Sequence, residues 1–388
     1  MKNPVYINSI ASISPLGTTR EEIWDNYKTN QHFIEQHDFS GSEAFAAILS
    51  SKQKAEVENL RNSESRFKGL DNSVLYSIIS ARTALKEAKW EKGESIGINI
   101  GSSRGATQLF EKHHKEFIEK GKVGVLASPS TTLGNISSWV AQDFRTSGPD
   151  ISHSVTCSTG LHAVLNGVVW LQSGFADKFV VGGSEAALTP FTIAQMKAMK
   201  IYATKDLKYP CQALNMEKEH NSMVLGEAAG VACISQNPEN SIAKISGIGY
   251  ATEELKHSVS ISANGTCFQK SMKMAIGDIA MSEIDAVVMH APGTIKGDEA
   301  EINAIKAIFG NDLPALTSNK WKIGHTFGAS GILSMELAIL MLQHDEFIPV
   351  PFSAISKAPK KLENILVNAV GFGGNAVSIL ISKNVPMF

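Results

Sequence analysis

Two segments of the chain open in the same way, and this similarity constrains the fold more than any other feature. Residues 155–160 (VTCSTG) and 324–328 (GHTFG) each place a reactive side chain, Cys157 or His325, before an apolar run with helical spacing. Each has a glycine three residues further on, and each is followed by a glycine-rich turn and a strand-like run, which ends at residue 235 or 382. The pattern favours a chain built from two related halves.

A boundary between such halves is expected near residue 238, because residues 237–240 (NPEN) have the composition of a turn. The halves would then span residues 1–238 and 239–388. Strand-like and helix-like stretches alternate along the chain, which favours an α/β layered fold with buried strands. With 388 residues, 43% of them apolar, the chain can bury a core of that size.

The overall composition argues against several classes of function. The formal net charge of -2 gives no field that would attract nucleic acid or an anionic membrane. Four cysteines without a CxxC pair do not suggest a disulfide framework or a cysteine zinc site, and a reduced, cytoplasmic setting is expected. The N-terminus lacks the apolar run of a signal peptide. The best candidate for a membrane span, residues 332–342, is short and contains Glu336, so we interpret it as a buried helix.

Cys157 is a candidate nucleophile because it lies where a helix is predicted to begin. A helix N-terminus favours negative charge, so this position would lower the pKa of the thiol and raise its thiolate fraction. The alternative is that Cys157 is a small buried hydrophobic residue, as lone cysteines usually are. The local sequence alone leaves both interpretations open.

Two histidines also occupy positions that suit chemistry. His290 ends an apolar strand-like run, and polar residues at strand ends in α/β folds often face the active crevice. His325 precedes a predicted helix, whereas His162, one turn into the Cys157 helix, is interpreted as a packed structural residue. Spacing alone does not bring Cys157, His290 and His325 together.

Charged and glycine-rich segments lie near these histidines in sequence. Asp298 and Glu299 are expected on a solvated helix face. The glycine-rich turn over residues 371–374 could let backbone N–H groups approach a substrate oxygen, but it is not a GxGxxG motif, and no P-loop is present.

Together these segments resemble the β-ketoacyl-acyl-carrier-protein synthases, of the elongating type that uses one cysteine and two histidines. Seven motifs appear in the family's order over nearly the whole chain. They are residues 14–17 (SPLG), 157–163 (CSTGLHA), 182–186 (GGSEA), 225–230 (LGEAAG), 290–301 (HAPGTIKGDEAE), 320–331 (KWKIGHTFGASG) and 368–375 (NAVGFGGN). A purely structural role for each of these residues would not predict that the motifs occur in the family's order.

The resemblance implies a thiolase fold of two similar halves in five α-β-α-β-α layers, usually dimeric. It implies that Cys157 accepts an acyl chain as a thioester, and that His290 and His325 bind the malonyl thioester and promote its decarboxylation. The other implied site residues support this chemistry: Lys320 and Glu301 as a buried pair, Phe372 as a gating aromatic that forms an oxyanion hole with the Cys157 N–H, and Thr294, Gly371 and Gly373 around them.

The resemblance also implies partners. An acyl carrier protein would bring the substrate on its phosphopantetheine arm, so neither a metal nor a resident cofactor is required. Arg66 and Lys68 fall where the family places a carrier-docking helix, although they could equally form an ordinary solvated basic stretch. The second subunit would be a copy of this chain or a related synthase chain.

The chain departs from the family's pattern at three places. Pro292 stands where a threonine is common, Val370 where a phenylalanine is common, and residues 211–215 (CQALN) where an Arg-Pro-Phe-Asp pattern is usual. These differences suggest a specialised synthase, in polyketide or pigment assembly, as an alternative to fatty-acid synthesis.

Three other classes of protein fit the sequence less well. A biosynthetic thiolase is disfavoured because such enzymes use a further cysteine near the C-terminus as a base, and no cysteine follows Cys267. Initiating and plant-type synthases are disfavoured because they carry an asparagine in place of His325. A non-catalytic chain-length subunit of a heterodimer usually lacks the cysteine that is present here.

Overall fold

A ten-stranded sheet forms the centre of the molecule in the computed structural model, which describes residues 3–133, 135–254, 261–355 and 357–384. The strands follow the order β11-β10-β12-β13-β9-β1-β8-β6-β4-β5. Their bounds are β1 (Val5–Ile13), β4 (Gly97–Gly101), β5 (Asp150–Ile151), β6 (Lys178–Glu185), β8 (Ala228–Ser235), β9 (Ala243–Thr252), β10 (Ala286–Val288), β11 (Ala315–Thr317), β12 (Asn364–Gly371) and β13 (Asn375–Ser382).

The sheet repeats itself outward from its middle. On one side the strands run β1, β8, β6, β4, β5, and on the other β9, β13, β12, β10, β11. Numbered by their order along the chain, both sets run first, fifth, fourth, second, third. On both sides the second strand is antiparallel to its two neighbours, and the outer strands are parallel. The two sets meet where β1 pairs with β9. The predicted similarity of two halves is therefore visible in the topology.

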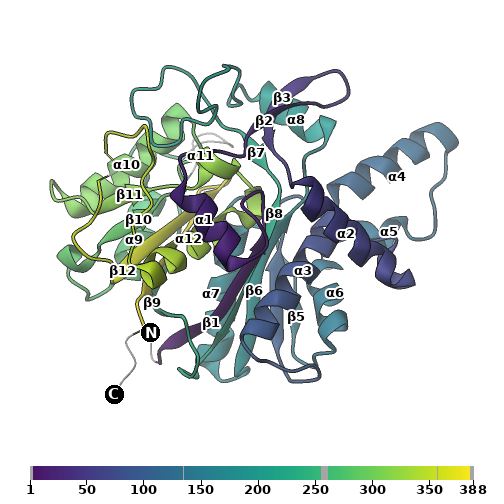
Figure 1. The fold of residues 1–388 in the computed structure, drawn as a ribbon, viewed down its shortest axis with the longest axis horizontal. Coiled ribbons are helices and arrows are strands. Elements are labelled where there is room, and N and C mark those ends of the chain that lie inside the picture. Colours follow the sequence, from purple (N-terminus) through teal and green to yellow (C-terminus); the bar gives the residue numbers. More distant parts are fainter. Residues whose placement is uncertain (1–2, 134, 255–260, 356, 385–388) are drawn as a thin grey trace.

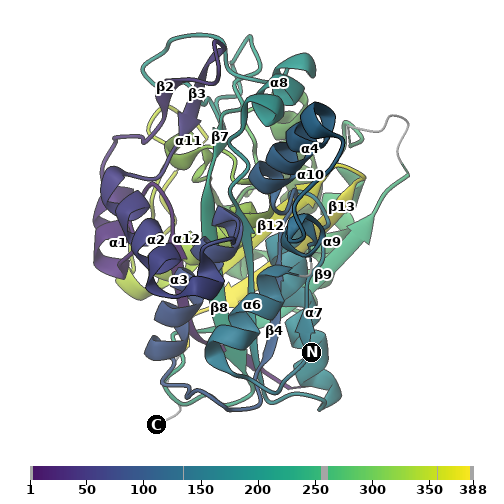
Figure 2. The ribbon, with the colours of Figure 1, turned by 90° about the vertical axis from the view of Figure 1, so that its right-hand side faces the viewer.

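Helices separate and cover the two half-sheets, which gives five layers (Figures 1 and 2). Helices α7 (Thr159–Ser173) and α12 (Ser330–His344) lie between the half-sheets and contact strands of both. The first half-sheet is covered outside by α3 (Asn72–Glu87) and α6 (Asn135–Phe144). On the other side α9 (Thr266–Ile276) packs on β9 and β13, with α10 (Ile295–Phe309) against it. The α/β thiolase-type layering is confirmed.

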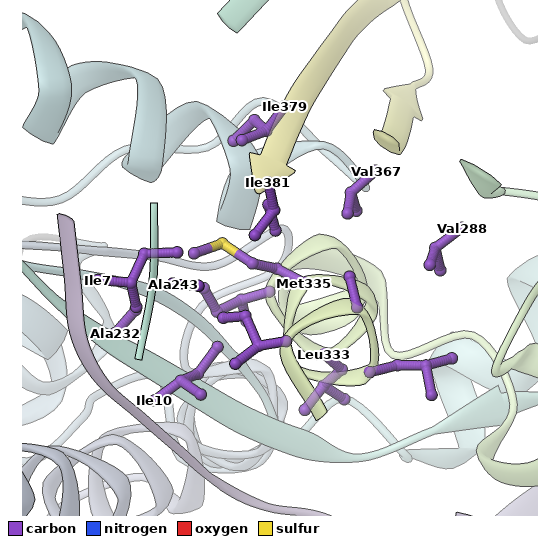
Figure 3. Close-up of a cluster of buried hydrophobic side chains, with 14 of the residues drawn as sticks. Ile7, Ile10, Ala232, Ala243, Val288, Leu333, Met335, Val367, Ile379 and Ile381 are labelled. Carbon is purple, nitrogen blue, oxygen red and sulfur yellow. The ribbon is translucent and has the colours of Figure 1, made fainter. Parts of the chain in front are cut away.

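The middle of the core is helix α12, whose side chains from Ser330 to Leu342 are all buried. Leu333 and Met335 extend from it among strand residues of both halves, including Ile7 and Ile381 (Figure 3). By length and composition the stretch Phe327–His344 could cross a membrane, but 89% of it is buried inside the protein. Its apolar sequence is explained by this place in the core, as predicted for residues 332–342.

The remaining elements lie around this core. They are α1 (Arg20–Lys28), α2 (Ser51–Ser63), α4 (Thr107–Lys120), α5 (Ala127–Thr131), α8 (Pro190–Ala198), α11 (Lys320–Ile323), the 3-10 turns η1 (Ser65–Phe67), η2 (Met281–Glu283) and η3 (Phe327–Ala329), and the small sheet of β2 (Glu35–Asp38), β3 (Glu43–Ala47) and β7 (Leu225–Gly226). Helix α4 extends away from the body at the right of Figure 1 and buries none of its residues. Phe110, Phe117 and Ile118 on it are exposed.

Candidate active site

Cys157, His290 and His325 line one cavity of about 630 Å³. Each lies next to an element end: Cys157 just before α7, His290 after β10, and His325 just before η3 and α12. The fold therefore brings together three residues that spacing alone could not connect. Other cavity residues from the sequence prediction are Thr294, Gly371 and Phe372, and the two unusual residues Pro292 and Val370 also face it.

The loop that carries Cys157 is strained and closely packed. Thr156 has a φ of +49°, in the left-handed region that costs a residue of this type about 1–3 kcal/mol and that clusters at functional sites. The glycine-rich turn approaches so closely that a Cβ on Gly371 would lie 1.9 Å from the Thr156 Oγ1. That hydroxyl donates to the carbonyl of Phe372 at 3.4 Å. Glycine at 371 thus permits contact between the two loops, and Gly373 follows with a φ of +104° in the same turn.

The protonation state of Cys157 differs from the sequence prediction. Burial and, after it, the Glu185 carboxylate raise the pKa of the Cys157 thiol to about 12, against the opposing charges of Arg104 and Lys320. The expected lowering by the helix start is wrong because the side chain is only 5% exposed and loses more solvation than the helix returns. Burial raises the pKa of the other three cysteines to about 12 as well, so position on the cavity, and not acidity, distinguishes Cys157.

Backbone contacts fix both histidines. The Glu301 carboxylate, from α10, accepts hydrogen bonds from the N–H groups of His290 and Ala291 at 3.0 and 2.9 Å. The N–H of His325 donates to the carbonyl of Val224 at 2.6 Å. The segment around β7 thereby holds His325, and α10 holds His290. The ring centroids lie 5.1 Å apart, and the rings are nearly perpendicular at 88°.

Both imidazoles are neutral near pH 7. Burial lowers the pKa of His325 to about 3, with the Lys320 charge adding to the effect. Burial, then His325 and Lys320, lower the pKa of His290 well below its usual value. A neutral imidazole donates one N–H. The Nδ1 atoms of both rings are buried without a hydrogen-bond partner among the described residues, and such orphaned groups often mark a functional site.

Lys320 and Glu301, for which the resemblance implied a buried pair, are both buried, and their side chains do not contact each other in a direct ion pair. The Lys320 ammonium donates to Asn319 Oδ1 at 3.0 Å and to Ser334 Oγ at 3.2 Å. Glu301 instead uses its oxygens on backbone N–H groups and on the Asn368 amide. The two charges still interact through space. Burial lowers the pKa of Lys320 to about 8, and Glu301 is the leading charge that opposes this.

Asp298 was expected on a solvated face, and that expectation is wrong. Its side chain is fully buried and forms an ion pair with Lys218 at 2.8 Å. It also accepts from the N–H groups of Gly293 at 3.0 Å and Leu214 at 3.2 Å. The carboxylate thus ties the loop after His290 to the 211–222 segment, the region where the chain departs from the family pattern. Neighbouring Glu299 is exposed, as predicted.

A second cavity, of about 380 Å³, also reaches Cys157 and shares Phe327 and Phe372 with the first. Its other lining residues are Ser103, Arg104, Thr107, Phe110, Glu111, Thr156 and Phe191. The sequence analysis did not identify Arg104. It follows β4, the counterpart in the first half of the strand that precedes His290. Applying the rule about polar strand-end residues to β4 would have found it.

The rim of the larger cavity carries two exposed lysines that the sequence analysis also missed, Lys200 and Lys296. Asn221 joins their segments: its amide donates to the carbonyl of Lys200 at 2.9 Å, and its Oδ1 accepts from the Ile295 N–H at 3.0 Å. Thr294 accepts from the Gly297 N–H and so caps α10 at this rim.

The two residues predicted to dock a carrier line neither cavity, and their charges differ in availability. Arg66, in η1, pairs with Glu64 at 2.8 Å and Asp143 at 3.6 Å. Lys68 is exposed. Among the described residues, no three histidine, cysteine or acidic side chains gather as a possible metal site.

Comparison with known proteins adds to this geometry. Models of the β-ketoacyl synthase N-terminal and C-terminal domains match residues 2–240 and 242–351. A 3-oxoacyl-[acyl-carrier-protein] synthase 2 from Vibrio cholerae serotype O1 is 26% identical over 98% of this chain and 99% of its own length. Two solved structures have the same fold. The ishigamide ketosynthase/chain length factor has a TM-score of 0.88 at 18% identity, covering 99% of this chain and 100% of that one. A β-ketoacyl synthase from Burkholderia phymatum STM815 has a TM-score of 0.86 at 19% identity, with the same coverage.

Proposed function

The chain belongs to the β-ketoacyl synthase family, and we propose that it joins an acyl group held on Cys157 to a malonyl unit that loses carbon dioxide at His290 and His325. It is an acyltransferase of the elongating type. The observation that carries the assignment of roles is the convergence of Cys157 with both histidines on one cavity.

The first half-reaction is acyl transfer to Cys157. The sulfur attacks the carbonyl carbon of a carrier thioester, the bond to the pantetheine sulfur breaks, and the thiol proton leaves with that sulfur. Because the pKa of Cys157 is raised, the thiolate is a minor species, and the nearby Arg104 and Lys320 charges favour its formation. The N–H groups of Phe372 and Cys157 would stabilise the tetrahedral oxyanion.

The second half-reaction takes place between the histidines. The malonyl thioester oxygen would accept an N–H from each neutral imidazole, the bond to the carboxylate carbon breaks, and carbon dioxide leaves. The electron pair remains as an enolate, which the two donors stabilise. The enolate carbon then attacks the acyl thioester, and the Cys157 sulfur leaves to regenerate the enzyme. Glu301 and Lys320 act here by positioning and by charge.

The partners follow from this chemistry. An acyl carrier protein presents both substrates on its phosphopantetheine arm, and a second synthase subunit completes a dimer. The chemistry requires no metal and no resident cofactor. We place the protein in the cytoplasm. The two halves of the chain span residues 1–238 and 239–388. Of the two residues proposed for docking, Lys68 has the freer charge.

A non-catalytic chain-length subunit is the alternative, because a ketosynthase/chain length factor is among the proteins of the same fold. Retention of Cys157, His290 and His325 on one cavity favours the catalyst.

The decisive experiment mixes the protein with acyl-loaded and malonyl-loaded carrier protein. The expected product is a carrier that bears a 3-oxoacyl chain two carbons longer, with one carbon dioxide released per product. A folded protein that forms neither an acyl-enzyme nor this product with any donor would favour the non-catalytic subunit.

A further inference from the structure

The two cavities that meet at Cys157 have different contents, and this difference assigns their occupants if the proposed function holds. Only the larger cavity contains His290 and His325. The malonyl group must therefore occupy the larger cavity. An acyl group on Cys157 that is present at the same time is left with the smaller one, beyond Phe327 and Phe372.

The smaller cavity is not a plain hydrocarbon pocket. Its wall contains phenylalanine rings, Phe110 and Phe191 among them, together with the charged side chains of Arg104 and Glu111. Glu111 is held in place because the Thr189 hydroxyl donates to its Oε1 at 2.6 Å. A saturated alkyl chain would remove water from both charged groups. It could not replace the hydrogen bonds that the water had made to them, which is unfavourable.

Arg104 is fixed but largely unpaired. Its backbone N–H donates to Glu185 at 3.1 Å, and its guanidinium lies 5.0 Å from the centre of the Phe327 ring. One side-chain donor, Nη1, bonds to Gln195 Oε1 at 2.7 Å. A guanidinium has five N–H donors, and no carboxylate lies within 4 Å of this one among the described residues. Donors therefore remain for a bound group beside the Phe327 ring.

We propose that the acyl group accepted on Cys157 is a neutral chain that carries a ketone or hydroxyl oxygen, which Arg104 recognises by hydrogen bonding. The guanidinium supplies donors for such an oxygen, and the ring of Phe327 holds the guanidinium from one face. Glu111 in the same wall disfavours a chain that ends in a carboxylate and can accept from a hydroxyl. The inference rests on the proposed function and adds the class of acyl substrate.

The test compares carrier proteins loaded with hexanoyl, octanoyl, 5-oxohexanoyl and 7-oxooctanoyl groups. The initial rate of Cys157 acylation is followed by intact mass. The wild-type protein is expected to load at least one oxo chain about tenfold to a hundredfold faster than the plain chain of equal length, as for a hydrogen bond to a charged group. Arg104→Met should load every chain more slowly, because the Arg104 charge favours the Cys157 thiolate, and should in addition lose the preference for oxo chains. Arg104→Lys should keep part of the preference.

Arg145→Met is the matched control, because Arg145 is exposed and lines neither cavity. It should leave the preference unchanged. Equal rates for oxo and plain chains in the wild-type protein, or a preference that persists in Arg104→Met, would overturn the inference alone. If no donor acylates Cys157, the proposed function fails and the inference fails with it. The wild-type comparison decides the matter even where a variant does not fold.

Discussion

The starts of helices α7 and α12 occupy equivalent places in the two halves of the molecule, yet they carry different chemistry. Cys157 precedes α7 and His325 precedes α12. Burial and Glu185 keep the cysteine a thiol, whereas burial and Lys320 keep the histidine neutral. The duplicated fold therefore supplies the position, whereas burial and, after it, the charge around each helix start set the protonation state.

The same two positions also differ in what they reach. Cys157 lies on both cavities, while His325 lies only on the larger one. This supports a division of labour in which the first half carries the acyl group and the second half handles the malonyl group.

The largest effect is expected from Cys157→Ala. Condensation should fall by at least about a thousandfold because the nucleophile is gone. Malonyl decarboxylation should continue, since the histidines do not need the sulfur. Carbon dioxide release and product mass are measured separately. Cys267→Ala, in α9, is the control and should retain condensation. Full condensation by Cys157→Ala would contradict the assignment of Cys157 as the nucleophile.

A smaller effect is expected from His290→Ala and His325→Ala. Loss of one donor to the enolate oxygen should slow decarboxylation by about a hundredfold to a thousandfold. Acyl loading of Cys157 should change far less. Single-turnover loading and carbon dioxide release, together with a check that each variant is folded, measure the two steps. An equal loss in both steps would contradict the division between the halves.

The pH dependence of the two steps should also differ. With a pKa of about 12, the thiolate fraction of Cys157 rises nearly tenfold per pH unit, so loading should increase from pH 6 to pH 9. The lowered pKa values of His290 and His325 keep both rings neutral on the acid side. Decarboxylation by the Cys157→Ala variant should therefore stay level from pH 5 to pH 6.5, where an ordinary histidine would become protonated. A loading rate that levels off near pH 7 would indicate a lowered thiol pKa instead.

The smallest effect concerns carrier docking. Lys68→Glu should raise the KM for carrier-bound substrates several-fold at low salt and leave small thioester mimics unaffected, because docking is electrostatic and screened by salt. Arg66→Glu should do less through docking, since its charge already faces Glu64 and Asp143. Unchanged carrier kinetics for both variants would remove this surface from the interface.

Much of the fold could be predicted because local sequence and core position agree. The β-branched run of residues 5–13 predicts the strand β1, and the apolar run of residues 332–342 predicts the buried helix α12. The order of the motifs identified Cys157, His290 and His325, which lie together on the larger cavity. The roles of these residues remain predictions.

Other features depend on contacts that no local pattern reveals. Asp298 is buried because its partner, Lys218, comes from a segment 80 residues away. The raised pKa of Cys157 depends on burial in the folded protein and on Glu185, which lies at the end of strand β6. The strand-end position of Arg104 after β4 could have marked it as a candidate, but its place beside Cys157 depends on the packing of β4 against α7.

The most direct test of the central claim is a peptide map after brief exposure to an acyl-loaded carrier protein. The account predicts one acyl group per chain, attached to the peptide that contains Cys157, with Cys211, Cys233 and Cys267 unmodified because they are buried away from both cavities. An acyl group found on another residue, with Cys157 free, would contradict it.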